Sequence, residues 1–219
     1  GQYEPVSQLV RDYVSAEGGV AEASVVGMTQ KLPARAAAMA NGTISHALDY
    51  DDTHFAYLGH PSVAVFPASF ALAQKTGASG KAFLEASLIG MEAATRIGAW
   101  LGRNHHFVGF HSTATAGAFG AALASARLLG LDVRGAGNAL GLVATRASGL
   151  RAQFGTMGKP FHAGMAASNG VEAALLAQSG FESRPETLEA KQGFAITHAA
   201  AMRVDDEILY GLGQSWMFE

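Results

Sequence analysis

Titratable side chains are concentrated in one stretch of a chain that is otherwise poor in charge. Residues 46–62 read HALDYDDTHFAYLGHPS, with three histidines and three aspartates, although only 15% of the 219 residues are charged. Histidine is the usual proton donor or acceptor near neutral pH, and a neighbouring carboxylate commonly fixes its tautomer and orientation. We therefore predict that this segment carries proton-transfer chemistry and is not an ordinary hydrated helix end.

A helix that starts at Pro33 and continues to Thr53 would present these residues in a defined way. Asp51 and Asp52 would point away from the others. The residues that would share one face of this helix are His46, Asp49, Tyr50 and Thr53. Aspartates are unfavourable at the C-terminal end of a helix, which carries partial negative charge, so other groups must compensate them. The chain then turns at LGHPS, which places His60 at the start of the next helix.

Two further motifs place polar groups at the start of helices made of small residues. In RNHHFVGFHSTATAG, His111 precedes an apolar helix, whereas His105 and His106 have the pattern of exposed loop residues. In GTMGKPFHAGMAASNG, Lys159 lies between a glycine and a proline, and His162 is either a site residue or an ordinary partly buried histidine. Helix N-termini carry free N–H groups that favour anions, so both motifs are well placed to bind a carboxylate.

The rest of the chain predicts helices and very few strands. Apolar residues recur with helical spacing in one segment after another, and only residues 23–27 have the composition of a short strand. Many of the 27 glycines fall inside helical patterns, which indicates close packing of helices. Glu92 and Arg96, four residues apart, are expected to form a solvated ion pair. The predicted fold class is all-α, a multihelical bundle, with residues 1–219 forming one helical domain.

The composition argues against several classes of protein. A net charge of −3 is unlike a nucleic-acid-binding protein, no apolar run is long enough to span a bilayer, and the chain has no cysteine. We therefore expect no nucleic-acid partner, no membrane and a cytoplasmic location. KTGASGKA superficially resembles a phosphate-binding loop, but Lys75 replaces the first required glycine and Ala82 replaces the required Ser or Thr.

The motifs also occur in a recognisable order. NGTISHALDYDDTH and GHPS, then GFHSTATAGAFGAA, then GTMGKPFHAGMAASNG resemble the MmgE/PrpD family, and the resemblance covers nearly the whole chain. That family includes 2-methylcitrate dehydratase, cis-aconitate decarboxylase and iminodisuccinate epimerase. The resemblance implies a large helical domain that builds most of an active site, and a smaller α/β lid domain that is absent from this chain. Residues 1–219 would then be a helical domain that is incomplete at both ends.

The resemblance implies roles for particular residues and a class of reaction. The matching positions are Asp49, His60 and His111 as catalytic groups, and Thr53 and Lys159 as substrate-binding groups. Family members act on small polycarboxylates by proton abstraction or elimination next to a carboxylate, where cationic donors must meet the developing charge. The implied activity is a lyase, 2-methylcitrate dehydratase-like first, with a decarboxylase or an isomerase (epimerase) as alternatives. The resemblance implies no metal and no cofactor.

Three further expectations concern assembly, geometry and alternative functions. The resemblance implies a homodimer, and the small apolar residues 113–126 exceed what one layer of helices would bury, which also predicts association. We expect the five site residues to converge on one cleft. Two other functions remain open: a Mg²⁺- or Mn²⁺-dependent hydrolase or prenyl-diphosphate enzyme, with residues 205–207 as a second acidic cluster, and a non-catalytic helical module.

Overall fold

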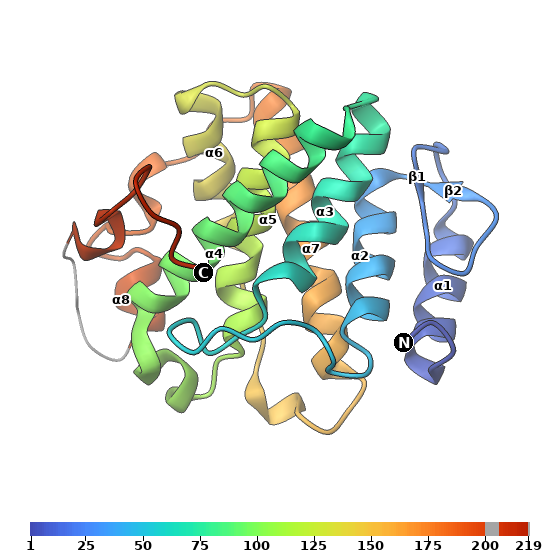
Figure 1. Ribbon diagram of the computed structural model, residues 1–219, viewed down its shortest axis with the longest axis horizontal. Helices are drawn as coiled ribbons and strands as arrows, with labels where there is room; N and C mark the ends of the chain where they lie inside the picture. Colours follow the sequence, from blue (N-terminus) through green and yellow to red (C-terminus); the bar gives the residue numbers. More distant parts are fainter. Residues whose placement is uncertain (200–205, 219) are drawn as a thin grey trace.

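The computed structural model describes residues 1–199 and 206–218, and this part of the chain is a bundle of helices (Figure 1). A two-stranded antiparallel hairpin lies beside α1 near the N-terminus, so the short strand expected within residues 23–27 is present. The α-helices are α1 (Pro5–Glu17), α2 (Ala34–Ser45), α3 (Pro61–Thr76), α4 (Gly80–Val108), α5 (Ser112–Leu128), α6 (Val133–Ala144), α7 (Gly158–Gln178) and α8 (Phe194–His198). The strands are β1 (Ala23–Ser24) and β2 (Lys31–Leu32), and the 3₁₀ helices are η1 (Arg151–Gln153), η2 (Pro185–Thr187) and η3 (Asp206–Leu209).

The all-α prediction is confirmed, and the central helix is α5. It packs against α3, α4, α6 and α7, and nearly all of its residues are buried, including Phe119. We predicted that the small apolar residues 113–126 would form surface for association. That prediction is wrong, because four neighbouring helices already cover this segment.

Glycines inside the helices allow backbones to approach closely, as the sequence indicated. A Cβ atom at Gly90 of α4 would lie 2.7 Å from the carbonyl oxygen of Gly120 in α5. A Cβ atom at Gly42 of α2 would lie 2.8 Å from the Cα atom of Gly164 in α7. Both contacts are closer than a side chain tolerates, so glycine is required by packing at these positions.

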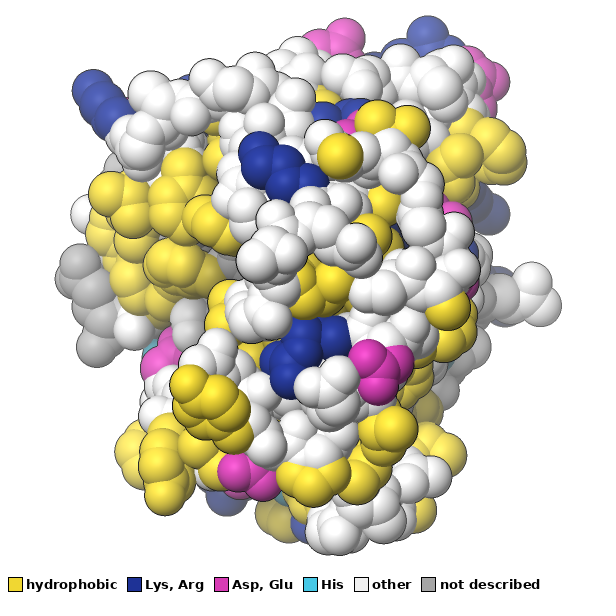
Figure 2. Space-filling model, turned by 90° about the vertical axis from the view of Figure 1, so that its right-hand side faces the viewer, with side chains coloured by type: hydrophobic (Ala, Val, Ile, Leu, Met, Phe, Trp, Pro, Cys, Tyr) yellow, Lys and Arg dark blue, Asp and Glu magenta, His cyan; other side chains and the backbone are white. Residues whose placement is uncertain are grey.

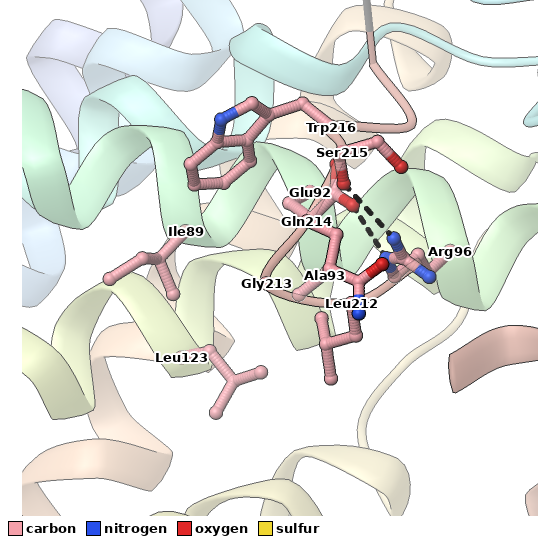
Figure 3. Close-up of a pocket in the computed structure, with 10 residues that line it drawn as sticks. All are labelled: Ile89, Glu92, Ala93, Arg96, Leu123, Leu212, Gly213, Gln214, Ser215 and Trp216. Carbon is pink, nitrogen blue, oxygen red and sulfur yellow. Dashed lines mark hydrogen bonds and ion pairs between the residues drawn. The ribbon is translucent and has the colours of Figure 1, made fainter. Parts of the chain in front are cut away.

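The pair formed by Glu92 and Arg96 is buried, and the prediction of a solvated pair is wrong. Each side chain is 6% exposed, because the C-terminal segment covers this part of α4. Arg96 donates to the carbonyl oxygens of Ile208 and Tyr210, both at 2.8 Å, and a Glu92 oxygen accepts from the backbone N–H of Met217 at 2.7 Å. The pair lines a cavity of about 360 Å³ between α4, α5 and the C-terminal segment (Figure 3).

His105 is also buried, contrary to the expectation that it lies in an exposed loop. Helix α4 continues to Val108 after an interruption at Gly102, where φ is 72°. Because the chain remains helical, His105 points into the domain. Its Nδ1 lies 2.7 Å from the carbonyl oxygen of His198, and its Nε2 lies 2.7 Å from Oγ1 of Thr115. Its neighbour His106 is half-buried in the same helix.

Several apolar side chains remain exposed at the end of the molecule formed by α1 and the hairpin. Figure 2 shows this end, where hydrophobic side chains occur in separate groups between polar and charged ones. The exposed large apolar residues of these elements and their connections are Tyr3, Leu9, Tyr13, Val20 and Val26. None of the described helices is both long and apolar enough to cross a membrane.

Candidate active site

The loop between α2 and α3 starts earlier than the sequence predicted. Helix α2 ends at Ser45 and not at Thr53, and His46 caps its C-terminus. Asp49 adopts a left-handed conformation with φ of 58°, which reverses the chain. Had α2 continued, three aspartates would have lain at the negative end of the helix dipole, whereas in the loop Asp49 and Asp51 contact histidine and lysine side chains. The expected shared helical face therefore does not exist.

The reversal returns Asp51 to His46, so the prediction that Asp51 points away is wrong. Nδ1 of His46 lies 2.9 Å and 3.1 Å from the two carboxylate oxygens of Asp51. The carboxylate of Asp52 does point elsewhere, as expected. It accepts from the backbone N–H of Ser62 at 3.1 Å and so caps the first turn of α3.

His60 lies between two aspartates, one of which also binds Lys159. Nδ1 of His60 lies 3.1 Å from Oδ2 of Asp51, although not in line for a straight hydrogen bond, and Nε2 lies 3.5 Å from Oδ1 of Asp49. The same Asp49 oxygen accepts from Nζ of Lys159 at 2.5 Å. Lys159 comes from the first turn of α7, which begins directly beside this loop. The contacts therefore run from Asp51 to His60, then to Asp49 and then to Lys159, so that carboxylates alternate with basic groups.

These contacts shift the pKa values of the loop residues away from their usual ranges. Burial opposes ionisation of Asp49 and Asp51, but hydrogen bonds from Lys159 and His46 and the surrounding positive charges outweigh it, so both carboxyl pKa values are lowered. Burial alone would lower the pKa of His60, but contact with Asp51 and the charge of Asp49 raise it above its ordinary value. His60 is therefore biased towards its charged form.

His111 occupies the opposite electrostatic situation. It caps the N-terminus of α5 and is 2% exposed, with its Nδ1 3.1 Å from Nδ1 of His162 and its ring stacked 5.8 Å from that of His46. Burial, reinforced by the neighbouring cations, holds the pKa of His111 far below its usual range. His162, which the sequence left ambiguous, belongs to this cluster.

Four of the five predicted residues lie together, and the fifth lies apart. Asp49, His60, His111 and Lys159 lie close together although they span more than a hundred positions of sequence, but of these only Asp49 and Lys159 line the cleft described below. Within the described part of the chain, the side chain of Thr53 forms no hydrogen bond, and it is exposed on the loop. A cleft of about 370 Å³ opens between this loop, α1 and the start of α7, and its lining includes His46, Asp49 and Lys159.

The loop also offers a set of groups that suits a divalent cation. His46, Asp49, Asp51 and His60 present ligand atoms that all lie within 4.8 Å of one another. Imidazole and carboxylate suit zinc and related metals. However, Lys159 already compensates Asp49 and would repel a cation. The second acidic cluster expected at residues 205–207 falls on Asp205, outside the described residues, and on two residues whose side chains are not described.

The all-α domain gathers histidine, aspartate and lysine side chains at the ends of α2, α5 and α7, and groups of these types are able to transfer protons and to bind an anion. The chain belongs to the MmgE/PrpD family: the family model described as MmgE/PrpD N-terminal domain matches residues 1–205. The fold and the linked motifs agree with this assignment.

Over the aligned segments, about a third of the residues are identical in this chain and its curated relatives. A cis-aconitate decarboxylase of Aspergillus terreus is 35% identical over 205 residues, covering 88% of this chain and 42% of the relative. The cis-aconitate decarboxylase of Homo sapiens is 34% identical over 181 residues, covering 77% and 36%, respectively. The cis-aconitate decarboxylase-like protein oryM of Aspergillus oryzae is 32% identical over 228 residues, covering 97% and 46%. The chain thus spans less than half the length of these relatives.

Sequence reasoning does not find every residue of this cluster. It turns Asp51 away from His46, because it predicts a continuous helix there. It gives His46 no role, and it leaves His162 open. That these residues are histidine and aspartate is the signal that the sequence offers. The chain reversal at Asp49 decides which of their side chains come into contact.

Proposed function

We propose that the complete protein carrying this domain is a metal-free lyase that acts on a small polycarboxylate, with cis-aconitate decarboxylation as the first candidate. The relatives named cis-aconitate decarboxylase support this choice. Dehydration of 2-methylcitrate, which the sequence alone favoured, is the second candidate, and epimerisation of iminodisuccinate is the third. All three reactions build negative charge next to a carboxylate.

The observation that carries this proposal is the opposite shift of two neighbouring histidines. The pKa of His60 is raised by Asp51 and Asp49, whereas the pKa of His111 is lowered by burial. Titratable groups whose environments push their pKa values apart are candidates for the acid and the base of a reaction. We assign His60 as the proton donor and His111 as the neutral acceptor.

With these roles, every bond, electron pair and proton of a decarboxylation is accounted for. The bond between carbon and the departing carboxylate breaks, carbon dioxide leaves, and the electron pair stays on the substrate next to a remaining carboxylate. Lys159 meets this charge, and His60 transfers a proton to the carbon and is reprotonated from solvent in the open cleft. In a dehydration, the neutral His111 would instead take the proton next to the carboxylate, and the hydroxyl would leave as water after protonation by His60.

A substrate screen on the complete protein tests the proposal. NMR spectra recorded after incubation with cis-aconitate, 2-methylcitrate, citrate and iminodisuccinate should show loss of one of them, with cis-aconitate the expected substrate. Turnover of 2-methylcitrate alone would select the second candidate. No turnover of any of the four would contradict the polycarboxylate assignment and favour a non-catalytic helical module.

The cluster of His46, Asp49, Asp51 and His60 favours one alternative, a metal-dependent enzyme. In the metal-free proposal, dialysis against EDTA leaves turnover unchanged, and added Zn²⁺ inhibits or has no effect. A loss of turnover in EDTA that Mg²⁺, Mn²⁺ or Zn²⁺ restores would establish the alternative instead.

Homodimer formation and a cytoplasmic location remain predictions for the complete protein. The exposed apolar side chains of α1 and the hairpin are compatible with a subunit interface (Figure 2). Sedimentation at micromolar concentration should give a dimer, and a monomer would contradict it.

A further inference from the structure

Asp51 has an unusual set of partners among the site residues. Its side chain is 9% exposed, and both of its contacts are imidazoles: Nδ1 of His46 at 2.9 Å and Nδ1 of His60 at 3.1 Å. Lys159, the lysine of the site, binds Asp49 and not Asp51. A buried carboxylate needs a compensating charge or hydrogen bonds. The two histidines provide this compensation, and Asp51 in turn constrains both of them.

The two histidines differ in what their second nitrogen faces. Nε2 of His46 is buried and has no hydrogen-bond partner among the described residues, so this ring is held inside the domain. Nε2 of His60 faces Asp49 at 3.5 Å, and Asp49 and Lys159 line the cleft. His46 is therefore placed to anchor Asp51, and Asp51 is placed to hold the ring of His60 through its inner nitrogen.

The backbone shows that this arrangement is built into the loop. Asp49 has φ of 58°, a left-handed conformation that is unfavourable for a non-glycine residue and persists where the surroundings enforce it. Without the reversal, Asp51 would not reach His46, five residues earlier. The strained residue and the carboxylate that depends on it belong to the same turn.

We propose that Asp51 is a positioning residue for the reaction: through Nδ1 it holds the ring of His60 with Nε2 towards Asp49, which lines the cleft, while His46 anchors Asp51. The resemblance to family motifs assigned no role to Asp51 or His46. The proposal rests on the proposed function, because it assumes that His60 donates a proton.

Asp51→Asn in the complete protein tests the proposal, with Asp52→Asn as the matched control. Asp52 is the adjacent residue, carries the same charge, is exposed and caps α3 through an oxygen that asparagine retains. Asp51→Asn should lower kcat on cis-aconitate about 10²-fold, the lower end of what a positioned acid contributes, with KM changed less than about threefold. The alkaline limb of the kcat–pH profile should move down by about one unit. Asp52→Asn should leave both unchanged.

Asp51→Glu keeps the negative charge, so it should recover part of kcat and return the alkaline limb towards its original position. Parental kcat and pH profile in Asp51→Asn would overturn the proposal. So would equal losses in Asp51→Asn and Asp52→Asn, or a loss confined to KM.

A measurement that does not depend on turnover tests the positioning role of Asp51 separately from the proposed function. Diethyl pyrocarbonate modifies neutral imidazole, and peptide mass spectrometry of His60 over about pH 5 to 9 reports its pKa directly. The midpoint for His60 should move to lower pH in Asp51→Asn and stay in place in Asp52→Asn. If no polycarboxylate is consumed but the midpoint moves, the proposed function fails and the positioning contact stands. An unmoved midpoint overturns the positioning role whether or not the protein is active.

Discussion

The described domain contains two clusters of histidines that contact helix α5. Their contact points on α5, His111 and Thr115, are about one helical turn apart. The site cluster comprises His46, His60, His111 and His162, and His111 caps α5. The second cluster comprises His105 and His198, and it reaches α5 through Thr115. Aspartates and a lysine surround the first, whereas the ring of His105 meets a carbonyl oxygen, a hydroxyl and the ring of Phe110.

The difference in partners reverses the effect of burial. Burial lowers the pKa of His105 to about 4, although its hydrogen bond to the carbonyl of His198 opposes this. His60 is also largely buried, but contact with Asp51 and the charge of Asp49 raise its pKa. The comparison teaches that carboxylate partners favour the charged form of a buried histidine, whereas neutral partners leave burial to favour the uncharged form.

The largest expected effect is on the site cluster. Lys159→Ala in the complete protein should lower kcat/KM on cis-aconitate by about 10²–10³, or about 3–4 kcal/mol, because charge that develops on the substrate loses its cation. The free energy of unfolding should fall by less than about 1 kcal/mol, since the partner Asp49 is half exposed. Steady-state kinetics and a melting curve measure both.

Lys75→Ala is the control for this prediction, because Lys75 also pairs with a carboxylate, that of Glu22, away from the site. Its turnover should match that of the parent. Parental kcat/KM in Lys159→Ala would remove this lysine from the site and weaken the polycarboxylate proposal.

In the second cluster, His105→Ala should reduce stability without reducing turnover. It leaves the hydroxyl of Thr115 and the carbonyl of His198 without their partner, which should cost about 2–3 kcal/mol in free energy of unfolding. Denaturant unfolding with kcat measured at a temperature where the variant is folded checks this. His106→Ala, at the half-buried neighbour, should cost less than about 1 kcal/mol. A fall in kcat for folded His105→Ala would make the two clusters functionally alike.

The two clusters should also respond oppositely to pH. Because the folded pKa of His105 is about 4 and the unfolded value is about 6.5, the unfolded state takes up the proton first as pH falls. His105 should therefore contribute about 2 kcal/mol of stability loss between pH 7 and pH 5. His60 has a raised pKa, so the stability that it contributes is fully present below its unfolded pKa and is lost as pH rises through its folded pKa.

Comparison of parent and His105→Gln isolates the first contribution. The drop in free energy of unfolding from pH 7 to pH 5, measured with denaturant, should be smaller in the variant by about 2 kcal/mol. Equal drops in both proteins would show that His105 does not resist protonation.

The smallest expected effect concerns Thr53. This residue lies on the loop of the site cluster, but within the described residues its side chain forms no hydrogen bond with any member of the cluster. Thr53→Ala should lower kcat/KM by less than about tenfold, the value of one hydrogen bond to substrate, and change stability by less than about 0.5 kcal/mol. Thr53→Ser, which keeps the hydroxyl, should retain parental kinetics. A hundredfold loss in Thr53→Ala would mean that Thr53 acts directly in the site.

The sequence by itself determined the helical class and the close packing at glycines, because local periodicity and composition are displayed directly by a linear chain. Its motifs, through their resemblance to a family, also predicted Asp49, His60, His111 and Lys159 as candidate site residues, and these four lie together. The tiny strand near residue 23 was also visible in this way.

Tertiary structure alone decided which of the remaining polar groups are buried and paired. Glu92 and Arg96 look like a surface pair until residues 208–217, more than a hundred positions later, cover them. Asp51 reaches His46 because α2 ends at Ser45 and Asp49 adopts a left-handed conformation in the loop that follows. Burial and backbone reversal depend on contacts between distant segments, and these contacts raise the pKa of His60 and lower the pKa values of His105 and His111.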